Sequence, residues 1–553
     1  MQTTQEMAGT ATTGVRLASG LAGMGKLQIA ALACIVLIGL VYVPHPFHDD
    51  QAFFTMGAWE MDHGAVLYRD YWDIKQPGIF LFYLAGGKLL GFNEFGIHGS
   101  ELLYFCTFAV VLMFTLRRYF ETGWATALLV LLTVGLYYGV TGLPHVTLDY
   151  LTQVEGLVAF PMFLCAWFTC RAAEVPERRA WFWFLSGLMA AGVLLFKLIF
   201  LPIIVSFWMA GLWFSRKKPH ALQAVLMASL GTLLPLLVVT AYFVRRGAFP
   251  EFWYANFVWP VRALGKLPLA GPGRLHESLQ FFLDGFAPLI ALSFLGLWRA
   301  VRRQRDPFGI TMLLWLVVGM FAVLIQRRSW WPHHFLLFVV PLGLLATKGI
   351  EFLWIQIERL NLDRPVPKVI FAGTLLLLFS PVIYPTAADG MLLAQYRFAL
   401  TSKDRLAFQC RYPGTQYLQS QDFGFLSQPG SLPGRIYVAG SSLYYYLSGR
   451  LSAVPQSAGV DDFLPEQWRN FARDLAASRP NYVFISVKDR GFFEKFSPET
   501  LLMLQRDFNS LREDAQGVWY VRKNPLMPSE NQRPFQFRQA SPGCPFHDPE
   551  LRI

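Results

Sequence analysis

Two adjacent carboxylates, in the run His48-Asp49-Asp50, follow the first long apolar stretch of the chain. Burial beside a like charge raises the pKa of one carboxyl group of such a pair. Asp49 or Asp50 can therefore take a proton from a hydroxyl group, or the two can hold a metal ion. A structural interpretation stands beside this one, because Asp49 can simply cap the amphipathic stretch 50–62. The local sequence leaves both interpretations open.

A lysine lies further along the same segment, in Asp73-Ile74-Lys75-Gln76-Pro77-Gly78, just before another apolar run. The ammonium group of Lys75 can bind a phosphate. It can equally extend from the membrane boundary into water while its methylene chain stays in lipid. Asp73 is a further candidate for the same site. These residues by themselves favour neither interpretation of the lysine.

Other ionisable residues stand at the ends of later apolar runs. A charged group that dips into a membrane protein is a functional candidate by default, although the helix dipole also favours an acid in a first helical turn. Lipid headgroups are the simplest partner for two arginines on the outer side. Two adjacent histidines are weak evidence for a metal, because neighbouring helical residues point in different directions. The candidates of this set are Asp149, Glu155, Lys197, Arg327, Arg328, His333 and His334.

The composition predicts that a membrane positions these residues. Of 553 residues, 54% are hydrophobic and 15% are charged, whereas a soluble globular chain carries about 25% charge. This excludes a disordered chain and disfavours a soluble cytosolic enzyme. The net charge of +11 is not read as a sign of nucleic-acid binding, because the basic residues stand in short clusters between apolar runs, as the positive-inside rule describes.

About eleven apolar runs approach the roughly 20 residues that a spanning helix needs, which predicts a mainly α-helical, polytopic bundle over 27–386. Residues 181–214 would form one helix of about 51 Å, too long for a hydrocarbon core of about 30 Å, and Lys197 and Pro202 near the middle favour a hairpin. The predicted spans are 27–43, 97–116, 124–143, 153–170, 181–196, 198–214, 221–244, 278–298, 308–325, 334–348 and 368–386.

With that hairpin, most basic clusters fall on one side, which the positive-inside rule assigns to the cytoplasm together with the N-terminal segment 1–26. The long loop 44–96 and everything after 386 then lie outside. The outer loop 245–277 carries five basic residues, against the rule.

The last part of the chain differs in composition. Alternating strand and helix patterns predict a small α/β domain over 387–524, and the Pro-, Gln- and Ser-rich segment 525–553 is expected to be disordered. Cys410 and Cys544 are the only cysteines outside the apolar runs, and we do not expect them to be joined. The expected strands are 435–440, 481–486 and 518–521, and the expected helices are 465–478 and 498–508.

In this order, the clusters resemble the GT-C superfamily of membrane glycosyltransferases, in the branch of protein O-mannosyltransferases and bacterial aminoarabinose transferases. The resemblance covers roughly 27–525, and its most specific part lies in the first outer loop. The similar residues are Asp49-Asp50, the stretch Leu67 to Gly78, Gln153-Val154-Glu155, Phe196-Lys197, Trp331 to Pro341 and Arg435-Ile436-Tyr437. Gln76 departs from the proline that the family commonly has.

The resemblance implies transfer of a sugar from a polyprenyl phosphate to an acceptor hydroxyl of a lipid, glycan or protein, on the outer face of a bacterial inner membrane. Asp49 would activate the acceptor, and Asp50 would orient it or hold a cation. Lys75 would stabilise the leaving phosphate, with Arg327 or Arg328 assisting. A divalent metal is possible, but no ligand set can be assigned, and direct attack would invert the anomeric centre.

Two other functions compete with this one. A transporter or lipid flippase should place ionisable groups near the bilayer midplane and often contains inverted repeats. A glycan polymerase or ligase uses similar donors but tends to carry a large loop between late spans. The concentration of charged candidates at outer helix ends favours the glycosyltransferase.

Overall fold

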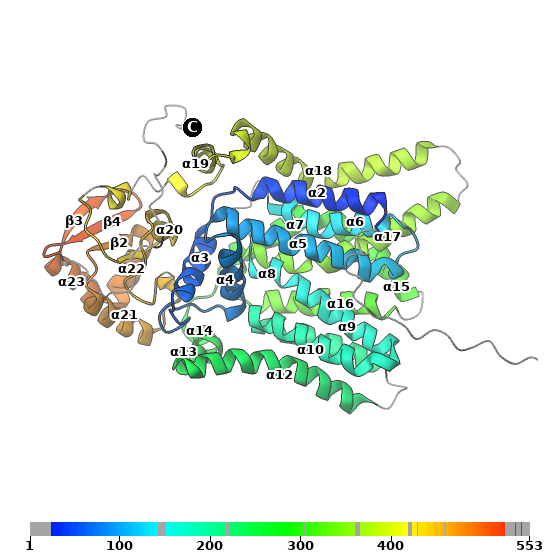
Figure 1. The fold of residues 1–553 in the computed structure, drawn as a ribbon, viewed down its shortest axis with the longest axis horizontal. Helices are drawn as coiled ribbons and strands as arrows, with labels where there is room; N and C mark the ends of the chain where they lie inside the picture. The colour runs from blue at the N-terminus through cyan, green and yellow to red at the C-terminus, as the bar shows by residue number, and fades with distance from the viewer. Residues whose placement is uncertain are drawn as a thin grey trace, which may run out of the picture.

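The computed structural model describes residues 24–141, 151–215, 220–302, 306–359, 365–418, 423–428, 430–457 and 459–525, together with Phe537 and Cys544. Within these residues, nine helices are long and apolar enough to cross a membrane, and three shorter apolar helices accompany them. They form a bundle of roughly parallel and antiparallel helices, and the C-terminal part of the chain, here called the C-terminal domain, packs against one end of it (Figure 1). We call this end of the bundle the domain end. The mainly α-helical membrane fold expected from the sequence is confirmed.

The helices of the bundle follow the predicted spans closely. Two of the predicted spans, 27–43 and 124–143, coincide with helices shorter than the other spans. In chain order the helices are α2 (Lys26–Tyr42), α5 (Glu94–Leu116), α6 (Ala125–Val130), the π-helical η2 (Leu131–Gly135), α7 (Leu136–Thr141), α8 (Val154–Leu157), α9 (Ala159–Glu174), α10 (Arg179–Phe196), α11 (Leu201–Ser215), α12 (Ala221–Arg245), α15 (Pro272–Arg302), α16 (Pro307–Leu324), α17 (Val339–Arg359) and α18 (Pro365–Gln395).

The long apolar run 181–214 is broken into two helices, as predicted. The break falls at Lys197, whose backbone is extended (φ −161°, ψ 114°). A Cβ on Gly211, late in α11, would lie 2.9 Å from the ring of Trp183, early in α10. The two helices therefore run antiparallel, and Lys197 lies at the turn between them.

Two helices of the first long loop lie at the domain end. They are α3 (Asp49–Asp62) and α4 (Pro77–Leu90), and an irregular segment connects them. Tyr68 in this segment has a positive φ of 71°, and its hydroxyl donates to the carbonyl oxygen of Lys75 at 2.8 Å. This bond fixes the backbone of the segment directly beside Lys75.

The other irregular and short elements join the bundle to the domain. They are α13 (Phe249–Trp253), the π-helical η6 (Tyr254–Val258), α14 (Trp259–Lys266), the 3-10 helix η7 (Pro332–Phe338) and α19 (Ser402–Arg411).

The C-terminal domain contains one four-stranded sheet in the order β1-β2-β4-β3. Strands β1 and β2 are parallel, and β4 pairs antiparallel with both β2 and β3. The elements are β1 (Ile436–Ala439), α20 (Leu443–Ser448), α21 (Pro465–Ser478), β2 (Tyr482–Ser486), α22 (Val487–Phe496), α23 (Pro498–Asp507), β3 (Phe508–Glu513) and β4 (Gly517–Arg522).

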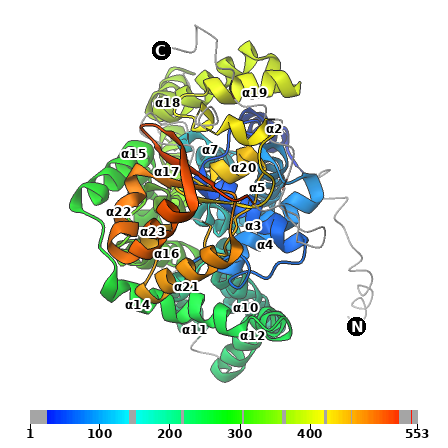
Figure 2. The same ribbon diagram turned by 90° about the vertical axis from the view of Figure 1, so that its left-hand side faces the viewer.

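The three expected strands are present, and β3 was missed. Five of its six residues are exposed, so no alternating burial pattern marks it as a strand. It is an edge strand that depends on pairing with β4 for its backbone hydrogen bonds. Figure 2 shows the molecule from the side on which the C-terminal domain lies. In this view the domain lies in front of the end of the bundle, and α20 packs against α3.

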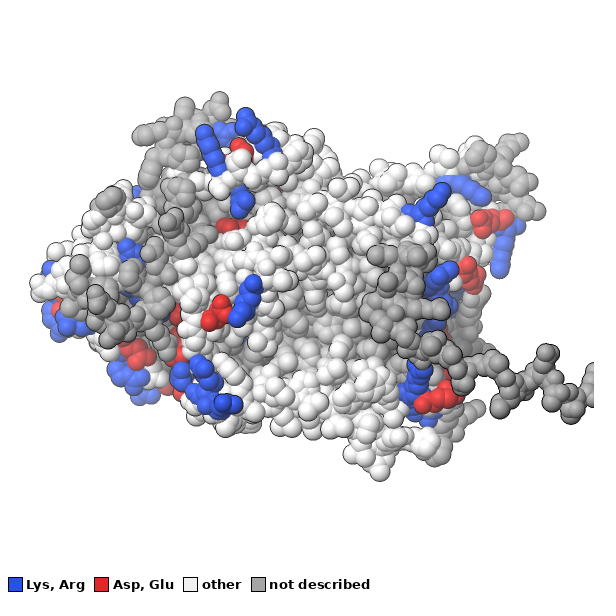
Figure 3. Space-filling model, viewed as in Figure 1, with Lys and Arg blue, Asp and Glu red and all other residues white. Residues whose placement is uncertain are grey.

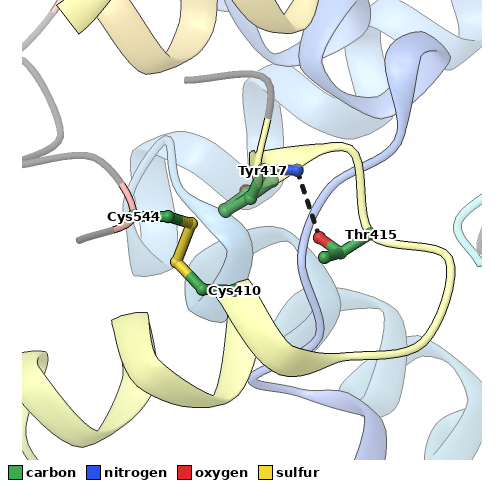
Figure 4. Close-up of a disulfide and its surroundings, with 4 residues drawn as sticks. All are labelled: Cys410, Thr415, Tyr417 and Cys544. Atoms are coloured by element: carbon green, nitrogen blue, oxygen red, sulfur yellow. Dashed lines mark hydrogen bonds between the residues drawn. A yellow bond between two sulfur atoms is a disulfide. The ribbon is translucent and has the colours of Figure 1, made fainter. Parts of the chain in front are cut away.

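A disulfide joins Cys410, at the end of α19, to Cys544 (Figure 4). The expectation that these cysteines remain separate is therefore wrong, because the fold brings them together across a sequence separation of 134 residues. The loop beyond Cys410 supports the start of α3: the hydroxyl of Tyr417 accepts from the backbone N–H of Phe47 at 3.0 Å. Phe537 belongs to the segment 525–553, which was expected to be disordered. Its ring packs against Trp59 of α3, with the ring centroids 5.4 Å apart.

Charged side chains gather at the two ends of the molecule and leave a broad uncharged band over the helices (Figure 3). This band is the surface expected of a protein that crosses a membrane several times. The chain is therefore a multi-pass membrane protein.

Candidate active site

The acidic pair stands at the first turn of α3, where the helix is capped by another residue. The cap is His48, whose backbone N–H donates to Oε1 of Gln51 at 2.7 Å. Asp49 is therefore the first residue of the helix, and the interpretation of Asp49 as its cap is wrong. Its carboxylate instead accepts hydrogen bonds from the C-terminal domain, from the hydroxyl of Ser441 at 3.1 Å and from the backbone N–H of Ser442.

The surroundings of Asp49 favour its protonated form. Burial raises the pKa of the Asp49 carboxyl group above its ordinary value, and the nearby Asp50 adds to this effect, while His48 and the bonds from Ser442 act in the opposite direction. Burial lowers the pKa of His48. A carboxylate with a raised pKa is a better proton acceptor than an ordinary aspartate.

Asp50 faces a cation. Its Oδ2 lies 3.1 Å from Nζ of Lys75, and that ammonium group also lies 4.5 Å from the centroid of the Phe54 ring. Burial acts to raise the pKa of Asp50, but Lys75 and His333 outweigh it, and the pKa lies below its ordinary value. For Lys75, burial acts to lower the pKa, and Asp50 and Asp73 raise it above the ordinary value. Both members of the pair are therefore charged at neutral pH.

A second ion pair, between Lys197 and Glu155, lies within the bundle. Nζ of Lys197 lies 2.6 Å from Oε1 of Glu155, which is only 2% exposed. Nε2 of His334 approaches the same oxygen at 3.7 Å. Glu155 stands in the first turn of α8, and Lys197 stands at the turn between α10 and α11. His333 interacts electrostatically with both Asp50 and Glu155, so the two ion pairs belong to one charged cluster.

A glycine allows the two lysines to converge. A Cβ on Gly78 would lie 2.6 Å from the carbonyl oxygen of Leu195, so the start of α4 can approach the end of α10 only where a side chain is absent. Pro77 at the first turn of α4 fixes the entry into that helix. Pro77 and Gly78 therefore let the start of α4 approach the end of α10, and Lys75 and Lys197 both act electrostatically on His333.

The histidines form a candidate metal group with Glu155. One potential ligand atom from each of Glu155, His333 and His334 lies within 4.8 Å of the others. However, the glutamate oxygen already accepts from Lys197, and Lys75 also interacts electrostatically with Glu155. In the structure an ammonium group therefore occupies the carboxylate oxygen of this group, and both lysines compete with a divalent cation for that carboxylate.

Asp73 lies beside the cluster and is 9% exposed. Burial raises its pKa to about 6, although Lys75 acts to lower it. One carboxylate oxygen accepts from the backbone N–H of Ile74 at 2.7 Å. The other is buried and makes no hydrogen bond within the described part of the chain. Asp73 can thus change its protonation state near neutral pH.

The two outer arginines have different environments. The side chain of Arg327 is exposed, whereas Arg328 lies 2.7 Å from the carboxylate of Asp462 in the C-terminal domain. Asp462 interacts electrostatically with Lys75, so Arg328 borders the charged cluster and Arg327 does not. Asp149 lies outside the described residues.

Sequence reasoning missed the residues that the C-terminal domain contributes, namely Ser441, Ser442 and Asp462. Ser441 and Ser442 follow the carboxyl end of β1, an end of parallel strands where polar groups often bind ligands. This signal could have drawn attention to the serines, but nothing local relates them to Asp49.

The helical bundle, the charged cluster at its end and the α/β domain beside that cluster form a membrane fold that is also seen in a solved structure. The crystal structure of ArnT from Cupriavidus metallidurans in the apo state shares this fold. The similarity has a TM-score of 0.55 at 16% sequence identity and covers 91% of this chain and 98% of that chain. The archaeal oligosaccharyltransferase AglB from Archaeoglobus fulgidus, in complex with an inhibitory peptide and a dolichol-phosphate, is less similar, with a TM-score of 0.45 at 10% identity over 91% of this chain and 75% of that chain. No family model and no curated protein sequence matches the chain.

Proposed function

We propose that this chain is an integral-membrane glycosyltransferase that moves a sugar from a polyprenyl-phosphate donor to an acceptor hydroxyl of a lipid, glycan or protein. The observation that carries the proposal is the convergence of two ammonium groups, Lys75 and Lys197, with Asp49, Asp50 and Glu155 where the lipid-facing bundle meets the domain. Such a site offers cations to a lipid-linked phosphate and a carboxylate to an acceptor. The shared fold with ArnT supports the same class of reaction.

In this mechanism Asp49 is the general base. The acceptor oxygen attacks the anomeric carbon, its proton passes to the carboxylate of Asp49, and the bond between that carbon and the phosphate oxygen breaks. The electron pair leaves with the polyprenyl phosphate. Attack opposite the leaving group inverts the anomeric configuration.

Lys75 and Lys197 stabilise the charge on the leaving phosphate. Each ammonium group has three N–H donors, and its carboxylate partner holds it in place, Asp50 for Lys75 and Glu155 for Lys197. Fixed cations of this kind need no reorganisation during the reaction. Arg328 assists from the edge of the cluster. In this mechanism Lys197 fills the place at Glu155 that a metal ion would take.

The reaction takes place on the extracytoplasmic face of a bacterial inner membrane. The disulfide between Cys410 and Cys544 supports this orientation of the C-terminal domain, because disulfides persist in oxidising compartments. The orientation also agrees with a cytoplasmic N-terminus under the positive-inside rule.

The test compares wild-type chain with Asp49→Asn in membrane vesicles supplied with a panel of radiolabelled polyprenyl-phosphate sugars. We expect the substitution to lower transfer by about 10²–10³-fold, as for other preorganised catalytic groups. Asp62→Asn is the matched control, since Asp62 ends the same helix and pairs with the exposed Lys88 at 2.7 Å.

Equal transfer by wild type and Asp49→Asn would exclude Asp49 as the base and direct attention to Glu155. Movement of intact lipid-linked sugar across the membrane, without transfer to any acceptor, would identify a flippase instead.

A further inference from the structure

One basic loop on the domain side plays no part in the mechanism above. It connects α12 with α15 and contains α13, η6 and α14, which follow one another without a break from Phe249 to Lys266. We call residues 249–266 the amphipathic segment. Its contacts with the C-terminal domain, such as the 2.7 Å ion pair between Arg262 and Glu466, place it at the domain end of the bundle (Figure 1).

The segment has an exposed apolar face. Successive members of this face are spaced about one helical turn apart, and three of them are aromatic. The exposed fractions range from 36% to 71%. The rings of Trp253 and Phe257 pack together with centroids 4.5 Å apart. The residues of this face are Phe249, Trp253, Phe257, Val261 and Leu264.

The opposite face packs on the protein next to the active site. Phe252 stacks on Phe243 at 4.5 Å, and both rings contact Tyr68, the residue that hydrogen-bonds the backbone of Lys75. Trp259 donates to the carbonyl oxygen of Asp462 at 3.2 Å. The segment thus has two apolar faces, and the protein covers only one of them.

Basic residues flank the exposed face. Arg245 ends α12 and Lys266 ends α14, and both are exposed. Neither lies within ion-pair distance of an acid among the residues that the structure describes, although Lys266 acts electrostatically on Glu466, which pairs with Arg262. Figure 3 shows Lys and Arg side chains gathered where α12 meets the segment. This loop is also the one whose basic residues oppose the positive-inside rule.

We infer that the amphipathic segment lies in the interface of the leaflet on the domain side, and that Arg245 and Lys266 bind the phosphates of anionic phospholipids. Aromatic rings are favoured at the depth of the headgroups, and basic residues beside an apolar helical face attract anionic lipid. The helix that precedes the segment, α12, also has exposed apolar side chains, among them Leu237, Val238 and Val244. The membrane interface therefore accounts for the exposed apolar face, and its anionic headgroups account for the exposed basic residues at the two ends of that face.

This lipid contact is coupled to the site through the covered face. The guanidinium of Arg328 lies 5.4 Å from the centroid of the Trp259 ring. The ring of Phe252 contacts Tyr68, whose hydroxyl donates to the carbonyl oxygen of Lys75. Bound phospholipid thus supports the amphipathic segment, whose covered face contacts Arg328 and the tyrosine beside Lys75.

Two measurements on the full-length chain test the inference without any assay of sugar transfer. In the first, fluorescent phosphatidylglycerol is titrated into the purified protein. The variant Arg245→Gln/Lys266→Gln should bind it more weakly, by about fivefold for each basic residue removed. The matched control is Arg469→Gln/Lys488→Gln, which removes one exposed arginine and one exposed lysine from the C-terminal domain and should leave binding unchanged.

The same titration distinguishes the segment from the proposed donor site. If Lys75→Gln abolishes binding and the Arg245→Gln/Lys266→Gln variant does not weaken it, the lipid occupies the donor site and the inference is wrong. Equal binding by the variant and the wild type also overturns it. Competition by inorganic phosphate as strong as by phosphatidylglycerol would show a simple anion site instead of a headgroup site.

In the second measurement, hydroxyl radicals label the protein in nanodiscs, and mass spectrometry locates the modified residues. Trp253 and Phe257 should be labelled several-fold less than Phe496 of the C-terminal domain, although all three are between 40% and 48% exposed on the protein itself. Similar labelling of the three residues would show that the segment stands in water and would refute its insertion.

Discussion

Replacing Lys197 by methionine should destabilise the protein, because the substitution leaves the carboxylate of Glu155 buried without its partner. The two groups lie 2.6 Å apart, and the side chains of Glu155 and Lys197 are 2% and 24% exposed. Removing one member of a buried ion pair costs about 3–5 kcal/mol. Since Lys197 keeps some contact with solvent, we expect a loss near the lower limit, about 3 kcal/mol.

The double variant Lys197→Met/Glu155→Leu should recover most of this loss. Apolar replacement of both members of a buried pair is often neutral or stabilising. As a control, Lys88→Met removes the exposed partner of Asp62 and should cost less than about 1 kcal/mol.

The free energy of unfolding of these variants can be measured by titration with a denaturing detergent, followed by circular dichroism. A double variant as unstable as Lys197→Met alone would refute the assignment of Lys197 as the group that neutralises Glu155. A double variant that is stable but inactive in sugar transfer would assign the pair a functional role.

Three further predictions concern the domain, the disulfide and metal dependence. Ser441→Ala removes a hydrogen bond that stabilises the charged form of Asp49. The acid limb of the pH–rate profile should therefore move to higher pH, and kcat should fall about tenfold. Ser441→Thr should restore both, and an unchanged profile for Ser441→Ala would contradict the role of Ser441. Cys410→Ser should lower the free energy of unfolding by about 2–4 kcal/mol, measured against Cys34→Ser, which removes a cysteine that forms no disulfide. Treatment with EDTA should leave transfer unchanged, because an ammonium group already occupies the carboxylate of the histidine–glutamate group; a loss that Mn²⁺ or Mg²⁺ restores would contradict this.

The bundle could be predicted because its signals are local. Each span is an apolar run near the length that a bilayer requires, and the break at Lys197 is marked by a charge in the middle of a run that is too long. Strand β3 could not be predicted, since it is held by backbone pairing with β4 and its side chains are largely exposed. The disulfide could not be predicted either, because it depends on how a distant segment returns to α19.

Some residues of the candidate site could likewise be predicted from local sequence, whereas others come together only in the folded chain. Asp50 and Lys75 stand in one loop whose motif is visible in the sequence, so their proximity could be expected. The contact of Asp49 with Ser441 joins segments that lie 392 residues apart, and no periodicity or spacing relates them. The pairing of Glu155 with Lys197 required the hairpin to be assigned correctly, since only that topology brings both residues to the same end of the bundle.

The bonds between Asp49 and the two serines bear on how the protein is made. Helices enter the membrane as the chain emerges, whereas Ser442 is synthesised 393 residues after Asp49. A chain whose bundle is already inserted but whose sheet has not formed lacks the two hydrogen-bond donors that hold the carboxylate of Asp49. Under the proposed function, catalytic competence is therefore acquired last, after the sheet has formed and Ser441 and Ser442 have reached Asp49.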